Sequence, residues 1–293
     1  MSPSNATDWS ATQYLQFRTE RTRPVHDLVA YLRALLSATA PRIYDLGCGP
    51  GNSTRVLLDA FPGARITGLD SSPDMLCKAR ESFPSHPNVD FVEGDLATFS
   101  LAKAHGDGDG HRGTEVDLLF SNAVFHWLRT PTRIPTLIRL FTSLSPGRIL
   151  ALQMPDNYQQ PSHSCMRATA LLPNTPWSPF FAATRIGDPS DPSRPDLDPI
   201  EPAAAYYNAL IPHAARVDVW RTEYLHVLED AGAIVEWVKG TGLQPYLNRI
   251  GDEGAKRGFL DEYERRLREA YGELVDGKVM LGYPRLFVVA VRK

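Results

Sequence analysis

The chain has 293 residues, a hydrophobic content of 43%, a charged content of 22% and a formal net charge of −3. This length is sufficient to bury a large core, and the charge lacks the basic excess typical of nucleic-acid-binding proteins. No apolar run is long enough to span a membrane, and the first residues lack the basic, then apolar order of a signal peptide. Three cysteines (Cys48, Cys77 and Cys165) have neither metal-ligand spacing nor an even count for disulfides. We therefore expect a cytoplasmic globular protein with no nucleic-acid partner, no membrane partner and no metal.

Helical periodicity begins near the N-terminus, over residues 8–36. Apolar residues recur at helical spacing after Pro24, which is expected to begin a second helix because proline suits the first helical turn. Tyr14 and Phe17 lie three residues apart on the preceding helix. From the sequence alone, these two aromatic residues are interpreted as core packing.

A glycine-rich turn follows the first predicted strand, within the segment RIYDLGCGPGN. An apolar strand stops at Gly47, Gly49 and Gly51, and a helix-like segment follows directly. Glycine leaves out the Cβ where a ligand must lie against the backbone, and a helix N-terminus offers free N–H groups. The spacing G-x-G-x-G, preceded by Asp45, differs from the G-x-G-x-x-G of dinucleotide enzymes. The turn predicts a nucleotide-type pocket, in which Cys48 is interpreted as a small packing residue.

Acidic residues end the next two predicted strands. Residues 65–70 end at Asp70, nineteen residues beyond Gly51, where a carboxylate can accept both hydroxyls of a ribose. Ser72 is a plausible N-cap of the following helix, and residues 89–95 form a third strand that ends at Asp95. Each acid could also be a cap or turn residue. Acids at three successive strand ends, however, would all face the crevice where open α/β sheets bind ligands.

Two more β–α steps complete the first half of the chain. Residues 101–114 form a loop whose D-G-D-G lacks the later glutamate of a calcium site, so a metal is rejected there. Residues 116–123 form the fourth strand, with Asn122 at its end. A helix over 131–144 and a strand over 148–154 follow. Strands joined through helices by right-handed crossovers are expected to lie parallel in the sheet.

The second half is less regular. Eight prolines between residues 173 and 202 predict an irregular covering segment. The elements expected after it are a helix over 203–213, a strand over 217–228, helices around 231–240 and 252–272, and a terminal strand over 283–293. We expect residues 1–293 to form a single domain with N-terminal helices (8–40), a core (41–154), a cap insertion (155–215) and a C-terminal part (216–293).

Several longer motifs are spread over nearly the whole chain. They are YLQFxxERxRP at 14–24, DLGCGPGNST at 45–54, ITGLDSSPxML at 66–76, QMPDN at 153–157, WRTxY at 220–224, TGL at 241–243 and PRLF at 284–287. With these motifs, the chain resembles the trans-aconitate methyltransferase family of class I S-adenosylmethionine-dependent methyltransferases. The resemblance implies a Rossmann-like α/β fold with a seven-stranded, mostly parallel sheet, an antiparallel last strand and a helical cap insertion. The 101–114 loop and the longer proline-rich insert depart from the family pattern.

The resemblance also implies a cofactor, S-adenosyl-L-methionine, with S-adenosyl-L-homocysteine as its product. The N-terminal helices would then act as a lid, with an arginine reaching the methionine carboxylate, and His126 and Trp127 would line the pocket. The residues implied to contact the cofactor are Tyr14, Phe17, Arg21, Arg23, Asp45, Gly47, Gly49, Gly51, Asn52, Asp70, Ser71, Met75, Asp95, Leu96, Asn122, Ala123 and Trp127.

The chemistry of a small carboxylic-acid substrate can be compared with the remaining residues. A carboxylate is already ionised at neutral pH, with a reference pKa of about 4, so no general base and no catalytic residue is expected. The carboxylates that do not react need cations, and arginine binds them bidentately. Arg221 and Arg285 lie in apolar strands, although either could form an ordinary surface ion pair. Further positioning candidates are His163, Gln153, Asn157, Trp220 and Tyr224.

Other classes of protein remain possible at this point. A nicotinamide oxidoreductase is disfavoured because the glycine spacing differs and no catalytic Tyr-Lys or His-Asp grouping follows. A non-catalytic cofactor-binding regulator would bind S-adenosylmethionine without turnover. A methyltransferase acting on a phenol, a fatty acid or a polyketide-type acid is also possible, although a phenol would require a base. The chain could act as a monomer or as a homodimer.

Overall fold

The structure is a computed structural model that describes residues 17–101 and 116–293. The predicted residue Tyr14 and almost all of the 101–114 loop lie outside the described residues. Among the described residues, no helix has both the length and the apolar character needed to cross a membrane.

One seven-stranded sheet runs through the described chain, in the order β3-β2-β1-β4-β5-β7-β6. Strand β1 pairs in parallel with β2 and β4, β2 pairs in parallel with β3, and β4 pairs in parallel with β5. Strand β7 pairs antiparallel with β5. The predicted sheet, with its antiparallel last strand, is therefore confirmed. Its strands are β1 (Arg42–Leu46), β2 (Arg65–Asp70), β3 (Val89–Glu93), β4 (Leu118–Asn122), β5 (Ile149–Pro155), β6 (Ala214–Leu228) and β7 (Val279–Arg292).

The described chain divides into two compact units. The sheet unit comprises Arg18–Pro155, Glu201–Thr222 and Arg285–Lys293. The helical unit comprises Asp156–Ile200 and Glu223–Pro284, together with Phe17. Strands β6 and β7 contribute residues to both units, and the segment predicted as a cap (155–215) is divided between them after Ile200. The domain boundaries expected from the sequence remain a prediction.

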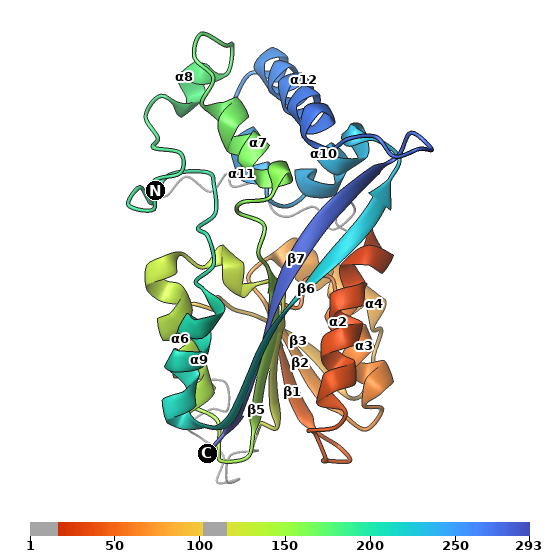
Figure 1. The fold of residues 1–293 in the computed structure, drawn as a ribbon. Helices are drawn as coiled ribbons and strands as arrows, with labels where there is room; N and C mark the ends of the chain where they lie inside the picture. The colour runs from red at the N-terminus through yellow and green to blue at the C-terminus, as the bar shows by residue number, and fades with distance from the viewer. Residues whose placement is uncertain (1–16, 102–115) are drawn as a thin grey trace. The chain divides into compact units, whose positions relative to one another are not determined.

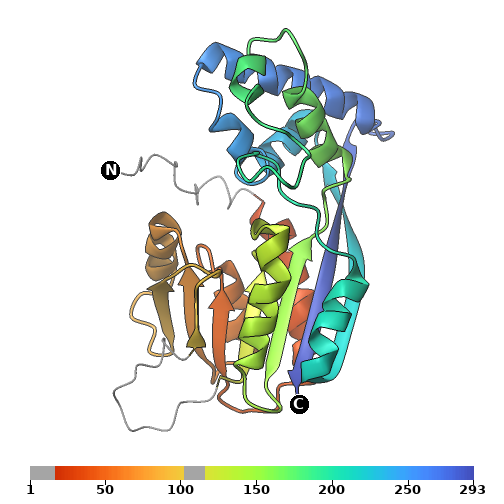
Figure 2. The ribbon, with the colours of Figure 1, turned by 90° about the vertical axis from the view of Figure 1, so that its left-hand side faces the viewer.

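Helices cover both faces of the sheet unit (Figures 1 and 2). The interior strands β4 and β5 are buried almost throughout, as expected for parallel strands with helices on both faces. Strand order changes direction at β1, which lies between β2 and β4, so a ligand site is expected where β1 ends. The helices on one face are α2 (Arg18–Leu32), α3 (Asn52–Ala60) and α4 (Pro73–Ser82), and those on the other are α6 (Thr130–Thr142) and α9 (Ala203–Leu210), which continues as the 3-10 helix η2 (Ile211–His213).

Helix α2 differs from the sequence expectation. A new helix was predicted to begin at Pro24, but α2 continues through this residue. Proline removes one helical hydrogen bond and costs about 3 kcal/mol in a helix interior. Beyond it, Val25, Leu28 and Leu32 are buried, and each buried side chain of this type contributes roughly 1.5–3 kcal/mol. Burial of this face therefore outweighs the proline.

The helical unit has its own core. Its helices are α7 (Pro161–Ala170), α8 (Ser178–Phe181), α10 (Ala231–Lys239), α11 (Gln244–Leu247) and α12 (Glu253–Ala270). Trp237, Phe259 and Tyr263 lie at the centre of the buried cluster that these helices share. The Tyr263 hydroxyl donates to the carbonyl of Ser162 at 2.6 Å, which ties α12 to α7.

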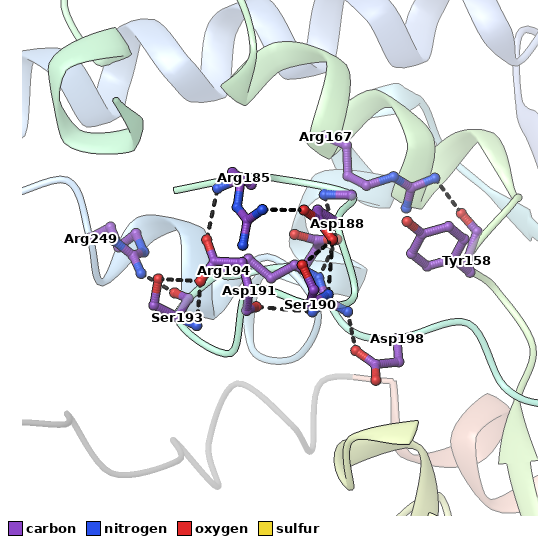
Figure 3. A network of polar contacts seen from close by, with 12 residues as sticks. Tyr158, Arg167, Arg185, Asp188, Ser190, Asp191, Ser193, Arg194, Asp198 and Arg249 are labelled. Atoms are coloured by element: carbon purple, nitrogen blue, oxygen red, sulfur yellow. Dashed lines mark hydrogen bonds and ion pairs between the residues drawn. The ribbon is translucent and has the colours of Figure 1, made fainter. Parts of the chain in front are cut away.

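The proline-rich chain between α8 and α9 is irregular, as predicted, and polar contacts hold it together (Figure 3). Arg194 is buried and pairs with Asp198 and, at 3.2 Å, with Asp196. Asp191 accepts hydrogen bonds from the backbone N–H groups of Arg185 and Ser193, and these bonds lower its pKa to about 2. Charge pairing and turn hydrogen bonds thus replace regular secondary structure in this segment.

Candidate active site

The glycine turn after β1 has the conformation that its sequence predicts. Gly47, Gly49 and Gly51 all have positive φ angles, of 73°, 56° and 89°. A Cβ on Gly47 would lie 2.2 Å from Val124, and one on Gly51 would lie 2.8 Å from Phe83. At Gly49, in contrast, no described heavy atom beyond the chain neighbours lies within 4 Å of such a Cβ. The turn is therefore closed by packing at its two ends and open in its middle.

Asp70 ends β2 and braces this turn. One carboxylate oxygen accepts the backbone N–H of Gly49 at 2.8 Å, and the other accepts that of Ser72 at 3.0 Å. Ser72 caps α4 by accepting from the backbone N–H of Met75, with Pro73 in the first turn, as predicted. Both carboxylate oxygens of Asp70 therefore lie at the backbone of the turn, where the sequence predicts the ribose.

Two buried polar atoms beside the turn have no partner among the described residues. Asp45 is fully buried and accepts the hydroxyls of Ser53 and Thr54 on one oxygen, while its other oxygen has no hydrogen bond. The side-chain N–H₂ of Asn52, at the start of α3, also has no acceptor. Buried polar groups are normally satisfied. An unsatisfied acceptor and an unsatisfied donor fit the ammonium and carboxylate of an amino-acid group, such as the methionine end of S-adenosylmethionine.

The other residues predicted around the turn differ in exposure. Asp95 lies two residues beyond the end of β3, is exposed and accepts the backbone N–H of Ala97, so it caps its own turn. Ser71 is exposed, whereas Met75 and Leu96 are buried. Burial also raises the pKa of the Cys48 thiol, which agrees with a packing role.

The segment after β4 lies against the glycine turn. Ala123 has a left-handed backbone with φ of 57°, although it is not glycine, and its N–H donates to the carbonyl of Gln153 at 2.9 Å. The side chain of Val124 then packs on Gly47. The next residues form the 3-10 helix η1 (Phe125–Trp127), in which His126 and Trp127 are half-buried and their rings lie 5.0 Å apart.

A polar chain crosses three strands at the carboxyl end of β5. Arg285 is buried and donates to the side-chain carbonyl of Gln153 at 3.2 Å, and Gln153 in turn donates to the side chain of Asn122. The three residues belong to β7, β5 and β4. The bond to Gln153 fixes the direction of the planar guanidinium of Arg285 at this end of the sheet.

Arg221 does not share this face of the sheet. Trp220 stacks on Phe287 with ring centroids 4.9 Å apart, and Phe287 lies two residues from Arg285 in β7. Successive side chains of a strand point to opposite faces, so Arg221 points away from the side occupied by Trp220 and Arg285. It is also exposed. The structure therefore brings Arg285 together with Gln153 and Asn122, with Trp220 on the same face of the sheet and Arg221 on the other.

The two predicted arginines of α2 also differ in exposure. Arg21 is buried, with 8% of its surface exposed, whereas Arg23 is exposed. Both lie in the first turns of α2, which packs on α3 and β5. Arg21 is therefore the better candidate for a ligand carboxylate.

The remaining candidates belong to the helical unit. Asn157 is buried, and neither its amide oxygen nor its amide nitrogen has a partner among the described residues. The Nδ1 atom of His163 lies 3.0 Å from the hydroxyl of Ser162, and burial, followed by the charge of Arg167, lowers the pKa of His163 to about 3. His163 is consequently a neutral hydrogen-bonding group and not a cation. Of the predicted aromatic residues, Phe17 packs on Trp237, and Tyr224 stacks on His226.

Sequence reasoning missed one polar group in the sheet unit. Arg133 of α6 is fully buried, pairs with Glu201 at 2.8 Å and donates to the backbone carbonyls of Phe125 in η1 and of Leu128, which follows η1. Tyr206 donates to the same Glu201 carboxylate. A signal was present, because Arg133 falls on the same helical face as Leu137 and Leu140, where an apolar residue is expected.

The fold and the turn define a class of protein. A family model described as "Methyltransferase domain" matches residues 44–150. The YcgJ protein of Bacillus subtilis, a solved structure, aligns with 92% of this chain and 99% of its own at a TM-score of 0.51 and 10% identity, which shows the fold alone. A sheet of this order with a G-x-G-x-G turn after β1 is that of the class I methyltransferases.

Curated relatives identify the family within this class. Proteins named trans-aconitate 2-methyltransferase from Agrobacterium fabrum and Rhizobium rhizogenes are each 45% identical to this chain, and one from Rhodopseudomonas palustris is 42% identical. Each alignment covers 97% of this chain and 99% of the relative. The chain belongs to the trans-aconitate 2-methyltransferase family.

Proposed function

We propose that this protein transfers the methyl group of S-adenosyl-L-methionine to a carboxylate of trans-aconitate, or of a similar small di- or tricarboxylic acid. The products are a methyl ester and S-adenosyl-L-homocysteine. The observation that supports an acidic substrate is the buried guanidinium of Arg285, held by the neutral amide of Gln153 at the carboxyl end of the sheet. The names and high coverage of the curated relatives support the same substrate.

The residues around the glycine turn fit the proposed cofactor. We assign the free oxygen of Asp45 to the ammonium, the amide of Asn52 to the carboxylate and Asp70 to the ribose hydroxyls. Gly49 leaves the space for close approach to the backbone. When bound, the cofactor supplies a methyl group on a positively charged sulfur. The chain then has to bind, orient and shield the two reactants, because a carboxylate nucleophile needs no proton removed.

On the substrate side, Arg285 is assigned to the carboxylates that do not react. A cation bonded to the reacting oxygen would reduce its nucleophilicity, so the guanidinium serves better as a spectator anchor. Gln153 bonds the guanidinium and is itself bonded to Asn122, which fixes the orientation of the guanidinium. A fixed guanidinium can orient the bound substrate as well as attract its charge. Asn157 and neutral His163 are proposed as additional hydrogen-bonding groups.

Methyl transfer to a panel of acids tests this function. Purified protein would be incubated with methyl-labelled cofactor and mono-, di- and tricarboxylic acids, and the labelled product treated with mild alkali. We expect transfer to trans-aconitate and release of the label by alkali, which is the behaviour of an ester. Alkali-stable label on a phenol would favour the alternative methyltransferase, and cofactor binding without transfer to any acid would favour a regulator.

The cellular setting follows from this proposal. We infer that the protein acts in the cytoplasm on a small molecule, as a monomer or homodimer, without a nucleic-acid or membrane partner. Light scattering of the purified protein distinguishes the two oligomeric states.

A further inference from the structure

Arg133 makes three polar contacts with two separate parts of the sheet unit. Its Nε donates to the carbonyl of Phe125 at 3.1 Å, one terminal nitrogen donates to the carbonyl of Leu128 at 2.8 Å, and the other pairs with Glu201 at 2.8 Å. The side chain is fully buried. A buried charge is costly unless it is paired and hydrogen-bonded, and the Glu201 carboxylate, which also accepts from Tyr206, supplies the counter-charge.

One carbonyl belongs to Phe125, the first residue of η1, and the other to Leu128, which follows η1, so the two lie on either side of His126 and Trp127 in the chain. Within this segment, the N–H of Trp127 donates to Val124 at 2.9 Å and that of Leu128 donates to Phe125 at 3.1 Å. These short-range bonds form only one turn, and the segment begins at Ala123 with φ of 57°, a conformation that is strained for a non-glycine residue. On its other side, Val124 packs against Gly47 of the glycine turn. Strain at one end and a single turn of 3-10 helix require an external support.

We propose that Arg133 is a positioning residue for methyl transfer, which holds residues 123–128 in the strained conformation that keeps Val124 on the glycine turn. Its effect on the cofactor rests on the proposed function, whereas its hold on the segment does not. Arg133 acts through the backbone and touches neither reactant. Glu201 extends the support to the chain that precedes α9, far from η1 in sequence.

Arginine and lysine differ at such a position. The planar guanidinium has five donors and reaches three acceptors in different directions, whereas an ammonium is a point charge. Arg133→Lys should keep the pairing with Glu201 and lose at least one carbonyl bond. A matched control is Arg148→Lys, because Arg148 also pairs with a carboxylate of the sheet unit, that of Asp117. This pair lies at the amino ends of β4 and β5, whereas η1 follows the carboxyl end of β4.

Hydrogen exchange and calorimetry test the proposal. In Arg133→Lys, we expect amide exchange at Trp127 and Leu128 to accelerate at least tenfold and the Kd for S-adenosylhomocysteine to rise at least fivefold. Arg148→Lys should change neither quantity. Unchanged exchange and affinity in Arg133→Lys would overturn the proposal, as would equal changes in the two variants.

A second variant covers a failure to fold. If Arg133→Lys does not fold, Glu201→Gln removes the counter-charge while keeping the shape of the partner, and it should accelerate exchange at the same two amides by a smaller factor. Exchange at wild-type rates in folded Glu201→Gln would contradict the proposal. If wild-type protein fails to bind S-adenosylhomocysteine, the proposed function is wrong, and the exchange data still decide whether Arg133 holds the segment.

Discussion

At the scale of single residues, the pKa of Asp45 leads to the prediction that cofactor binding depends on pH. Burial raises its pKa to about 6, despite the opposing hydrogen bonds from Ser53 and Thr54. A carboxyl group with a raised pKa in the folded state stabilises the fold below its unfolded pKa of about 3.9, and this contribution is lost as pH rises through 6. A bound ammonium should reverse the preference and favour the charged form. Affinity for S-adenosylhomocysteine is therefore expected to fall about tenfold between pH 7 and pH 5.

Calorimetry across this range measures the effect. Asp45→Asn should bind more weakly at pH 7 and show little dependence on pH, and Asp59→Asn, at an exposed acid of α3 outside the predicted site, should behave like wild type. Constant wild-type affinity from pH 5 to pH 7 would mean that Asp45 does not face the ammonium.

The two strand arginines lead to opposite predictions. Arg285→Ala should cost roughly 2–4 kcal/mol in kcat/KM for a tricarboxylate, because it removes a charged hydrogen-bonding partner. Arg221→Ala should stay within about 0.5 kcal/mol, as is usual for an exposed site. Lysine at position 285 should restore only part of the loss. Steady-state kinetics with tricarboxylic and monocarboxylic acids measure both variants.

Comparing the two kinds of substrate distinguishes a loss of substrate binding from a loss of folded protein in Arg285→Ala. The penalty for Arg285→Ala should shrink for a monocarboxylic acid, which has no spectator carboxylate to anchor, while the KM for the cofactor stays unchanged. Equal losses for both variants, or for both substrates, would remove Arg285 from the proposed substrate site.

At the scale of elements, alanine variants of two glycines distinguish the cost of backbone strain from the loss of a ligand contact. Gly49 and Gly147 both have positive φ angles, of 56° and 79°, and an added Cβ meets no described neighbour within 4 Å at either. Alanine should cost about 1–2 kcal/mol of stability at each position, because the strain is the same. Only Gly49 lies in the turn after β1. Gly49→Ala should therefore weaken S-adenosylhomocysteine binding at least tenfold, and Gly147→Ala should leave it unchanged.

Urea denaturation and calorimetry provide the two measurements. Similar losses of stability with a difference in affinity would support close approach of the cofactor at Gly49. If Gly49→Ala binds as tightly as Gly147→Ala, the open side of the turn does not receive the ligand.

The sequence predicted these elements well where local patterns decide them. The glycine turn, the cap at Ser72 and the strand ending at Asp70 depend on residues within a few positions of each other. Helix α2 was not predicted correctly, because the burial of Val25 and Leu28 outweighs a local proline signal. The position of Arg221 on the other face of β6 also depends on register, since one residue of shift moves a side chain across the sheet.

Long-range polar contacts were beyond sequence reasoning. Arg133 and Glu201 are 68 residues apart, and no local pattern relates them. Arg285 and Gln153 are separated by 132 residues and meet only because β7 pairs antiparallel with β5. For such pairs, a sequence shows the types of residue available, whereas the topology decides which of them meet.

At the scale of the whole molecule, the proposed reaction needs no proton transfer, and this gives a prediction about turnover. A substrate carboxylate is fully ionised above about pH 6, so the rate should not depend on a catalytic base. His163, the buried histidine whose pKa is about 3, stays neutral throughout the physiological range and adds no titration there. At saturating cofactor and trans-aconitate, kcat is therefore expected to vary by less than about twofold between pH 6 and pH 8.5.

Saturation with cofactor matters, because the titration of Asp45 near pH 6 should affect KM for the cofactor and not kcat. A phenolic substrate would behave differently: its hydroxyl must lose a proton, so kcat would rise about tenfold per pH unit below the pKa of the responsible base. Rates measured with radiolabelled cofactor at half-unit pH intervals distinguish the two profiles. A steep rise near pH 7 that disappears in His126→Ala or His163→Ala would indicate a general base and a hydroxyl substrate, and the carboxylate assignment would then fail while the class I fold and its cofactor site remained.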